Sequence, residues 1–176
     1  MEKGTLYFFT GLSGAGKTTL GSLFFEHLRA QKPNAVILDG DVVRSTWDTD
    51  VDYSTEARRS SAFRYFQVCR VLTDQGIDVV ACSISMYEDV RAWNRANIPN
   101  YKEIYVRVSM DTLYRRDQKQ LYSAGTQVVG KDLPWDEPRS ADIIVQNDGD
   151  ADPHTLVAEI ERALAEKGAK GIVLGA

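Results

Sequence analysis

The 176-residue sequence contains only two cysteines and two histidines, and it lacks a long apolar run. Cys69 and Cys82 do not form a Cys-x-x-Cys pair, so we expect two free thiols in a reducing compartment. His27 and His154 have no metal-ligand spacing, which argues against a zinc site. The apolar run Leu6–Phe9 is too short for a signal peptide or a membrane span. We therefore expect a soluble, cytoplasmic protein that binds no membrane.

Positive charge is not in excess either. The chain has 21 lysines and arginines against 25 aspartates and glutamates, which gives a formal net charge of −4. A protein that binds nucleic acid regardless of its sequence needs a basic surface, so we expect a small-molecule partner and no nucleic acid. With 43% hydrophobic and 26% charged residues, the composition also excludes a disordered or low-complexity chain. We expect one globular domain over residues 1–176.

Short apolar segments alternate with helical patterns along the chain. The apolar segments predict buried strands over residues 5–10, 35–38, 77–84, 103–108 and 143–145. Helices are predicted over residues 18–29, 54–75, 88–97, 111–116 and 152–167, with Ser54, Asp111 and Asp152 as N-caps. Residues 45–53 and 119–139 are expected to be loops, the second within a flexible lid over residues 115–139. This order predicts an α/β fold with a five-stranded parallel sheet and helices on both faces.

A phosphate-binding motif lies between the first predicted strand and the first predicted helix. Residues 11–18 read Gly-Leu-Ser-Gly-Ala-Gly-Lys-Thr and match G-x-x-x-x-G-K-[ST]. The glycines let backbone N–H groups face one anion, and the helix adds the positive end of its dipole. Lys17 can reach the β- and γ-phosphates, and the Thr18 hydroxyl can hold Mg²⁺. The motif predicts a P-loop NTPase fold whose nucleotide phosphates are bound by Gly11, Ser13, Gly14, Ala15, Gly16, Lys17, Thr18 and Thr19.

Among P-loop proteins, a small kinase fits this chain best. The chain contains no Asn-Lys-x-Asp run, which a GTPase needs to read guanine, so ATP is the expected nucleotide. In P-loop kinases, cations close over the transferring phosphoryl group. Arg115, Arg116 and Lys119 have the character of such a lid, and a solvated charged face is the alternative for each of them.

Two aspartates follow the second predicted strand. Asp39 and Asp41 flank Gly40, and ligands of open parallel sheets collect where the strands end. Two carboxylates there can hold Mg²⁺ through water and orient an acceptor hydroxyl. An ordinary Asp-Gly turn is the alternative, but the phosphate-binding motif favours the functional interpretation.

Several motifs, taken in order, resemble the adenylylsulfate (APS) kinases. They are residues 11–19, Leu38–Asp41 with Arg44, Tyr53-Ser54 with Arg58 and Arg64, Ile84-Ser85 with Arg91, Arg116-Asp117 with Lys119 and Leu121-Tyr122, and Gly130 to Pro138. The resemblance implies transfer of the γ-phosphate of Mg-ATP to the ribose 3′-hydroxyl of adenylylsulfate, which gives the sulfate donor PAPS. It also implies a homodimer, because these kinases usually are homodimers.

The resemblance further implies roles for the matching residues. Catalysis is expected from Lys17, Asp39, Asp41 and Ser85, and metal binding from Thr18 and Asp39. Arg115 and Arg116 are expected to bind ATP, and Ser85 matches a serine that can carry a phosphate in some relatives. Tyr53 would stack on the acceptor base. The full set expected to bind the acceptor is Asp41, Arg44, Tyr53, Arg58, Ser61, Arg64, Ile84, Ser85, Lys119, Leu121 and Val128.

Departures from the family pattern cluster where the acceptor would bind. Val42, Ser61, Met86 and Glu88 replace family residues, and Val128 stands where the family lid has an aromatic. A kinase with another nucleotide acceptor would show such changes at the acceptor site. The cytidine diphosphoramidate kinases, paralogues within this family, resemble such a case. Drift in a working APS kinase and a non-catalytic nucleotide-binding subunit are the alternatives. If a base-stacking ring was lost here, Val128→Phe should favour an adenine acceptor.

Overall fold

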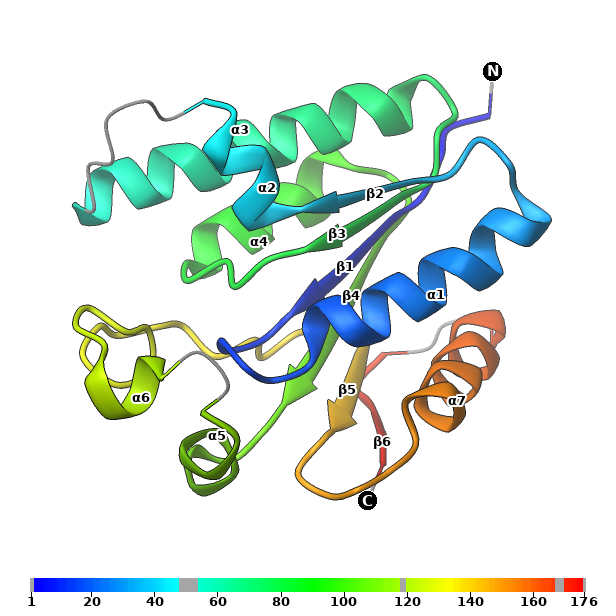
Figure 1. Cartoon of the computed structure of the whole chain (residues 1–176). Coiled ribbons are helices and arrows are strands. Elements are labelled where there is room, and N and C mark those ends of the chain that lie inside the picture. Colours follow the sequence, from blue (N-terminus) through cyan, green and yellow to red (C-terminus); the bar gives the residue numbers. More distant parts are fainter. Residues whose placement is uncertain (1, 48–53, 118–119, 167–169, 176) are drawn as a thin grey trace.

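The computed structural model describes residues 2–47, 54–117, 120–166 and 170–175 (Figure 1). Strands form one sheet in the order β2-β3-β1-β4-β5-β6, and every neighbouring pair is parallel. Their bounds are β1 Leu6–Thr10, β2 Val36–Asp39, β3 Val79–Cys82, β4 Tyr101–Arg107, β5 Ile143–Gln146 and β6 Ile172–Leu174. The α/β fold with a parallel sheet is confirmed, and each of the five predicted strands is present.

The prediction of five strands was wrong by one, because β6 adds a sixth strand at an edge of the sheet. β6 has three residues and pairs with β5, and its central residue, Val173, is 49% exposed. Three residues are too few to show the alternation or the buried apolar run by which a strand is recognised in a sequence. The strand forms because β5 offers its unpaired edge to the returning chain.

Seven helices lie in the described part of the chain. They are α1 Lys17–Gln31, α2 Gly40–Ser45, α3 Thr55–Asp74, α4 Glu88–Asn97, α5 Met110–Arg116, α6 Leu121–Ala124 and α7 Pro153–Ala165. The side chains of Ser54 and Asp152 cap α3 and α7, as predicted. The prediction that Asp111 caps α5 was wrong: the Ser109 hydroxyl accepts the capping bond, and Asp111 lies in the first turn. The predicted end of the last helix, at residue 167, lies outside the described residues.

Two short helices, α2 and α6, occur where the sequence predicted no helix. Asp39 ends β2 and also caps α2, since its carboxylate accepts the N–H groups of Asp41 (2.9 Å) and Val42 (3.4 Å). The Asp117 carboxylate similarly accepts the N–H groups of Tyr122 (2.9 Å) and Ser123 (3.1 Å) at the start of α6. Neither helix is long enough to show a helical period, so their caps are the main local signal.

Helices cover both faces of the sheet, as predicted (Figure 1). α1 and α7 pack together on one face, and α3 and α4 pack on the other. Side chains of β1 alternate between the two layers: the Phe9 ring lies 5.5 Å from Phe24 of α1, whereas Phe8 lies 4.9 Å from Phe66 of α3. Within the described ranges, no helix is long and apolar enough to cross a membrane.

The carboxyl ends of β1, β2 and β3 meet at one edge of the sheet. Phe9 and Asp39 are both in register with Cys82 of β3, so the loops that follow these strands leave the sheet side by side. β1 lies between β3 and β4, which puts the loop after β1 over the middle of the sheet. Open parallel sheets bind their ligands at this position.

Candidate active site

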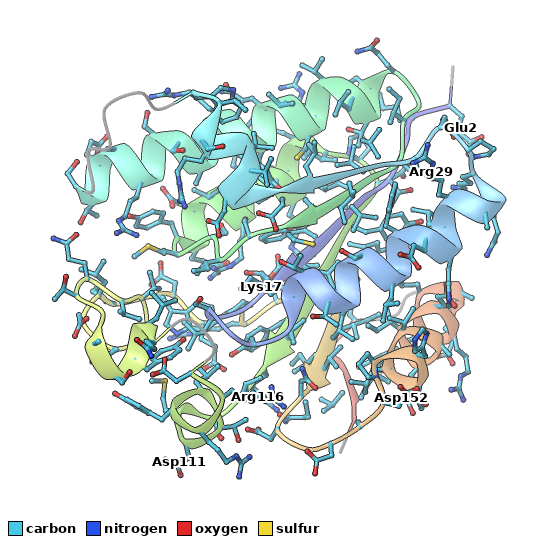
Figure 2. The ribbon with its side chains drawn as sticks, in the orientation of Figure 1. Glu2, Lys17, Arg29, Asp111, Arg116 and Asp152 are labelled. Atoms are coloured by element: carbon cyan, nitrogen blue, oxygen red, sulfur yellow. The ribbon has the colours of Figure 1, made fainter. Side chains whose placement is uncertain are left out.

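A cavity of about 750 Å³ opens at the carboxyl edge of the sheet. Its walls come from the phosphate-binding loop, α2, α3, the loop after β3, the lid and the loop after β5. Figure 2 shows Lys17 at the start of α1 and Arg116 at the end of α5, and both residues line this cavity. The volume lies in the upper part of the roughly 300–1,000 Å³ typical of ligand pockets.

The phosphate-binding loop has the backbone that its glycines allow. Gly14 and Gly16 have φ angles of 78° and 100°, which side chains rarely tolerate. A Cβ atom on Gly16 would also lie 2.7 Å from the amide nitrogen of Asn147, which donates to the carbonyl of Ala15 at 2.8 Å. Gly16 caps α1 without a side-chain hydrogen bond, and the first turn of α1 has no acidic residue. This helix end is therefore suited to an anion.

The first residues of α1 bring charge and a hydroxyl to the cavity. The Lys17 ammonium donates to the carbonyl of Leu12 at 2.8 Å, and the Thr18 hydroxyl donates to the Asp39 carboxylate at 3.2 Å. The end of β2 is thus joined to the start of α1. Of the residues expected to bind phosphate, Ser13, Gly14, Gly16, Lys17, Thr18 and Thr19 line the cavity, whereas Gly11 and Ala15 are buried and do not line it.

Asp39 and Asp41 both line the cavity but have different surroundings. One Asp39 oxygen is occupied in capping α2, and the other faces the Thr18 hydroxyl. The Asp41 side chain is 74% exposed, and its carboxylate accepts a 2.7 Å hydrogen bond from Arg44. Thr18 and Asp39 offer adjacent hard oxygen donors of the kind that Mg²⁺ prefers. The described residues contain no cluster of three acidic, histidine or cysteine side chains that would bind a metal ion alone.

Most residues expected to bind the acceptor meet on the far side of the cavity from α1. Arg44 of α2 and Arg58 of α3 bring positive charge, and the described lining on this side also includes Ser61, Ile84, Ser85 and Leu121. Arg64 is exposed on α3 and does not line the cavity, and Arg115 donates to the Thr112 hydroxyl rather than into it. Tyr53 and Lys119 lie outside the described residues.

Ser85 has an unusual conformation in the cavity wall. Its φ angle is +39°, a region that non-glycine residues rarely occupy. The side chain is buried, and among the described residues its hydroxyl has no hydrogen-bond partner. A buried, unpaired hydroxyl costs stability, and such groups are rare in native proteins and occur at strained or functional sites.

The sequence interpretation of Val128 is not supported by its position. Val128 is 6% exposed and packs in the core of the lid, away from the cavity lining. Its Cγ2 atom would lie 3.0 Å from a Cβ atom on Gly125, so the space around it is already filled. The expected gain of base stacking by Val128→Phe therefore has no physical basis in this fold.

We instead expect Val128→Phe to destabilise the protein by about 1–3 kcal/mol, because a ring would overfill the lid core. The measurement is chemical unfolding followed by circular dichroism. Val42→Phe is the matched control, because Val42 is 64% exposed at the cavity rim and should tolerate the ring within about 0.5 kcal/mol. Equal free energies of unfolding for the two variants would contradict the prediction.

Several lining residues were not predicted as site residues from the sequence, and three of them are informative. Asn147 follows β5 directly, so the rule that ligands meet strand ends could have identified it. Tyr122 of the lid donates its hydroxyl to the carbonyl of Ser13 at 2.7 Å, a contact between segments far apart in sequence. Burial raises the pKa of Tyr122 to about 12, so the hydroxyl keeps its proton as a donor at neutral pH. Trp47 also lines the cavity, although no motif marked it.

Cys82 lines the cavity floor but is not suited to nucleophilic chemistry. Burial, with the Asp39 carboxylate nearby, raises the pKa of its thiol to about 12. At neutral pH the sulfur therefore stays protonated, and the thiolate is the reactive form. Its sulfur packs against Gly21 of α1, where any larger residue would collide with it. Cys82 thus acts as a packing residue beneath the site.

Comparison with known proteins places the chain among kinases of one family. The family model of adenylylsulphate kinase matches residues 3–146. The cytidine diphosphoramidate kinase of Campylobacter jejuni is 36% identical over 143 residues, covering 78% of this chain and 83% of that protein. The adenylyl-sulfate kinase of Myxococcus xanthus is 35% identical over 180 aligned positions, covering 97% of this chain and 94% of that protein.

A solved structure of the same family has a similar fold. The Mycobacterium tuberculosis APS kinase, in complex with AMPPNP and APS, superposes with a TM-score of 0.82 at 27% identity. The match covers 94% of this chain and 100% of that one.

Proposed function

This chain belongs to the adenylylsulphate kinase family of phosphotransferases, and from that premise we propose that it transfers the γ-phosphate of ATP to the ribose 3′-hydroxyl of a nucleotide acceptor. The observation that carries the proposal is one continuous cavity. The phosphate-binding loop forms one side of it, and Arg44, Arg58 and Ser85 form the other. Asp39 contacts Thr18 of the donor side and Asp41 contacts Arg44 of the acceptor side, so the two aspartates connect the two sides.

The donor side would bind and neutralise the triphosphate. Lys17 would leave the Leu12 carbonyl for the β- and γ-phosphates, and the N-terminal end of α1 would face their oxygens. Arg116, which now donates to the carbonyl of Gly149 at 3.2 Å, would contact ATP from the lid side. Thr18 and Asp39 would hold Mg²⁺. When bound, the cation neutralises the charge that develops on the transferring phosphoryl group.

The acceptor side would orient the attacking hydroxyl. Asp41 would accept the proton of the ribose 3′-hydroxyl, because its carboxylate is exposed while Asp39 is occupied by α2 and Thr18. Arg44 and Arg58 would bind the anionic part of the acceptor, since guanidinium groups bind oxyanions with two parallel hydrogen bonds. Ser85 would contact the bound acceptor, because it lines the same side of the cavity as the two arginines.

We propose adenylylsulfate as the acceptor, with PAPS as the product. The two arginines suit its phosphosulfate group, and several relatives named adenylyl-sulfate kinase support this choice. Cytidine diphosphoramidate is the second candidate, favoured by the 36% identity to a kinase with that name. Val42 and Met86 also line the cavity at positions where the sequence departs from the adenylylsulfate kinases. A non-catalytic role is disfavoured, because Lys17, Asp39 and Asp41 all remain in place.

The test is ADP release in a coupled assay, with adenylylsulfate and cytidine diphosphoramidate in parallel and an acceptor-free control. We expect acceptor-dependent release with adenylylsulfate. Release with the cytidine compound alone would refute adenylylsulfate as the acceptor, while the proposed kinase activity would stand. Absence of release with both would contradict the kinase proposal and favour a regulatory subunit. The homodimer that the family resemblance implies can be checked on the same sample by light scattering.

A further inference from the structure

Arg91 of α4 lies outside the cavity lining, yet it contacts two segments that meet at the acceptor side. Its side chain is 1% exposed, so its guanidinium depends on protein partners. It donates to the Ser85 carbonyl at 2.8 Å, to the Asp136 carbonyl at 2.6 Å, and twice to the Glu88 carboxylate, at 2.6 and 3.1 Å. Four hydrogen bonds thus come from one side chain that has five N–H donors.

The first of these segments is the Ser85 loop, residues 83–87. The Thr10 hydroxyl donates to the Ile84 carbonyl at 2.6 Å, and Arg91 takes the next carbonyl, that of Ser85. Two successive carbonyls are therefore held from the protein interior. This arrangement fixes both peptide groups around the positive φ angle of Ser85, and Ser85 lines the cavity in this conformation.

The second segment is the lid strap, residues 135–137. Asp136 forms three hydrogen bonds here: its N–H donates to the Met86 carbonyl at 2.9 Å, its carbonyl accepts from Arg91, and its carboxylate accepts the N–H of Glu88 at 3.0 Å. The neighbouring Glu137 carboxylate accepts the Tyr105 hydroxyl at 3.0 Å. The strap is thus joined to the Ser85 loop, and Arg91 is the side chain that contacts both.

We propose that Arg91 is a positioning residue for the acceptor site. Arg91 holds the Ser85 loop and the lid strap in one arrangement, so that Ser85 and Met86 meet the acceptor in a fixed position. This role rests on the proposed phosphoryl transfer. Lysine cannot replace it, because a single ammonium lacks the planar fork that serves two carbonyls and a carboxylate together.

A purely structural role for Arg91 is the alternative, and Arg95 provides the matched control for it. Both arginines lie on α4 and approach the buried Glu103 carboxylate, Arg95 at 3.1 Å and Arg91 at 3.9 Å. Arg95 also donates to the carbonyl of Ser140, at 2.7 Å, and to the carboxylate of Asp142, at 3.5 Å, and its guanidinium lies over the Tyr101 ring. Arg95 therefore shares the buried charge network but not the contacts to the Ser85 loop and the strap.

The experiment compares Arg91→Lys with Arg95→Lys in steady-state kinetics and thermal unfolding. We expect Arg91→Lys to raise the KM for the acceptor at least about tenfold while the KM for ATP stays unchanged, because a small misplacement is enough for such a loss. Arg95→Lys should lower the Tm without raising the acceptor KM. Equal kinetic effects of the two variants, or a matching rise in the KM for ATP in Arg91→Lys, would overturn the proposal.

A readout independent of turnover is hydrogen exchange of the Glu88 and Asp136 amides, which donate within the joined segments. We expect faster exchange in Arg91→Lys than in Arg95→Lys, and equal exchange would overturn the proposal even if the wild type phosphorylates neither acceptor. Should Arg91→Lys fail to fold, Glu88→Ala carries the same test, because it removes the two hydrogen bonds that orient the Arg91 guanidinium. The Glu88 side chain is 50% exposed, so its loss should raise the acceptor KM and spare the Tm. An unchanged acceptor KM in that variant would overturn the proposal.

Discussion

Replacing Lys17 with alanine should lower kcat by about 10³-fold, which leaves little measurable turnover. The Lys17 ammonium lies at the junction of the phosphate-binding loop and α1, 2.8 Å from the Leu12 carbonyl, and it lines the cavity. From there it can follow the charge that develops on the γ-phosphate, which alanine cannot do. The measurement is acceptor-dependent ADP release at saturating ATP.

Lys3→Ala is the control for Lys17→Ala. Lys3 is an exposed lysine that pairs with Asp74, and it lies before β1, whereas the phosphate-binding loop follows the other end of that strand. It should keep wild-type turnover. Both variants should unfold close to the wild-type temperature, because Lys17 lines the cavity and is only partly buried. A Lys17→Ala protein with wild-type kcat would remove the basis for assigning phosphoryl transfer to this cavity.

Replacing Asp41 with asparagine should lower kcat by about 10²- to 10⁴-fold, the contribution usual for a general base. Asparagine keeps the shape of the side chain but accepts no proton. Asp41 is suited to this role by its exposure of 74% and its place beside Arg44. The Mg²⁺ concentration needed for half-maximal rate should stay unchanged, because Asp41 is not the carboxylate beside Thr18.

Asp39→Asn is the counterpart that separates the two aspartates. The Asp39 carboxylate faces the Thr18 hydroxyl at 3.2 Å, so this variant should require more Mg²⁺ for half-maximal rate. A magnesium titration of both variants makes the comparison. If the shift in Mg²⁺ requirement appears in Asp41→Asn and not in Asp39→Asn, the roles proposed for the two residues are exchanged.

The parts of the fold that the sequence predicted correctly are those with local causes. The glycine spacing of residues 11–16 requires a particular backbone, and Ser54 and Asp152 can cap a helix with atoms three residues away. Likewise, the pattern of apolar segments was enough to predict a parallel sheet. β6 and α2 were missed because each is too short to repeat the pattern of apolar residues that identifies a strand or a helix.

The residues of the candidate site likewise differ in whether the sequence alone could place them. Asp39 and Asp41 could be placed because strand ends of a parallel sheet converge, whatever the side chains do. Arg64 and Val128 could not, because the face of α3 and the packing of the lid decide where they point. The hydrogen bonds of Arg91 to Ser85 and Asp136 connect three separate segments, and no sequence pattern within any one segment predicts them.

The two buried cysteines have a practical consequence for studying the lid. Cys69 and Cys82 are the chain's only cysteines, both are buried, and burial raises the pKa of each thiol. Maleimide and iodoacetamide reagents attack the thiolate, so the native chain should take up little label at neutral pH. A single cysteine introduced at exposed Ser123 would then be labelled selectively. A fluorophore or spin label there could follow the lid in a protein that keeps both native thiols.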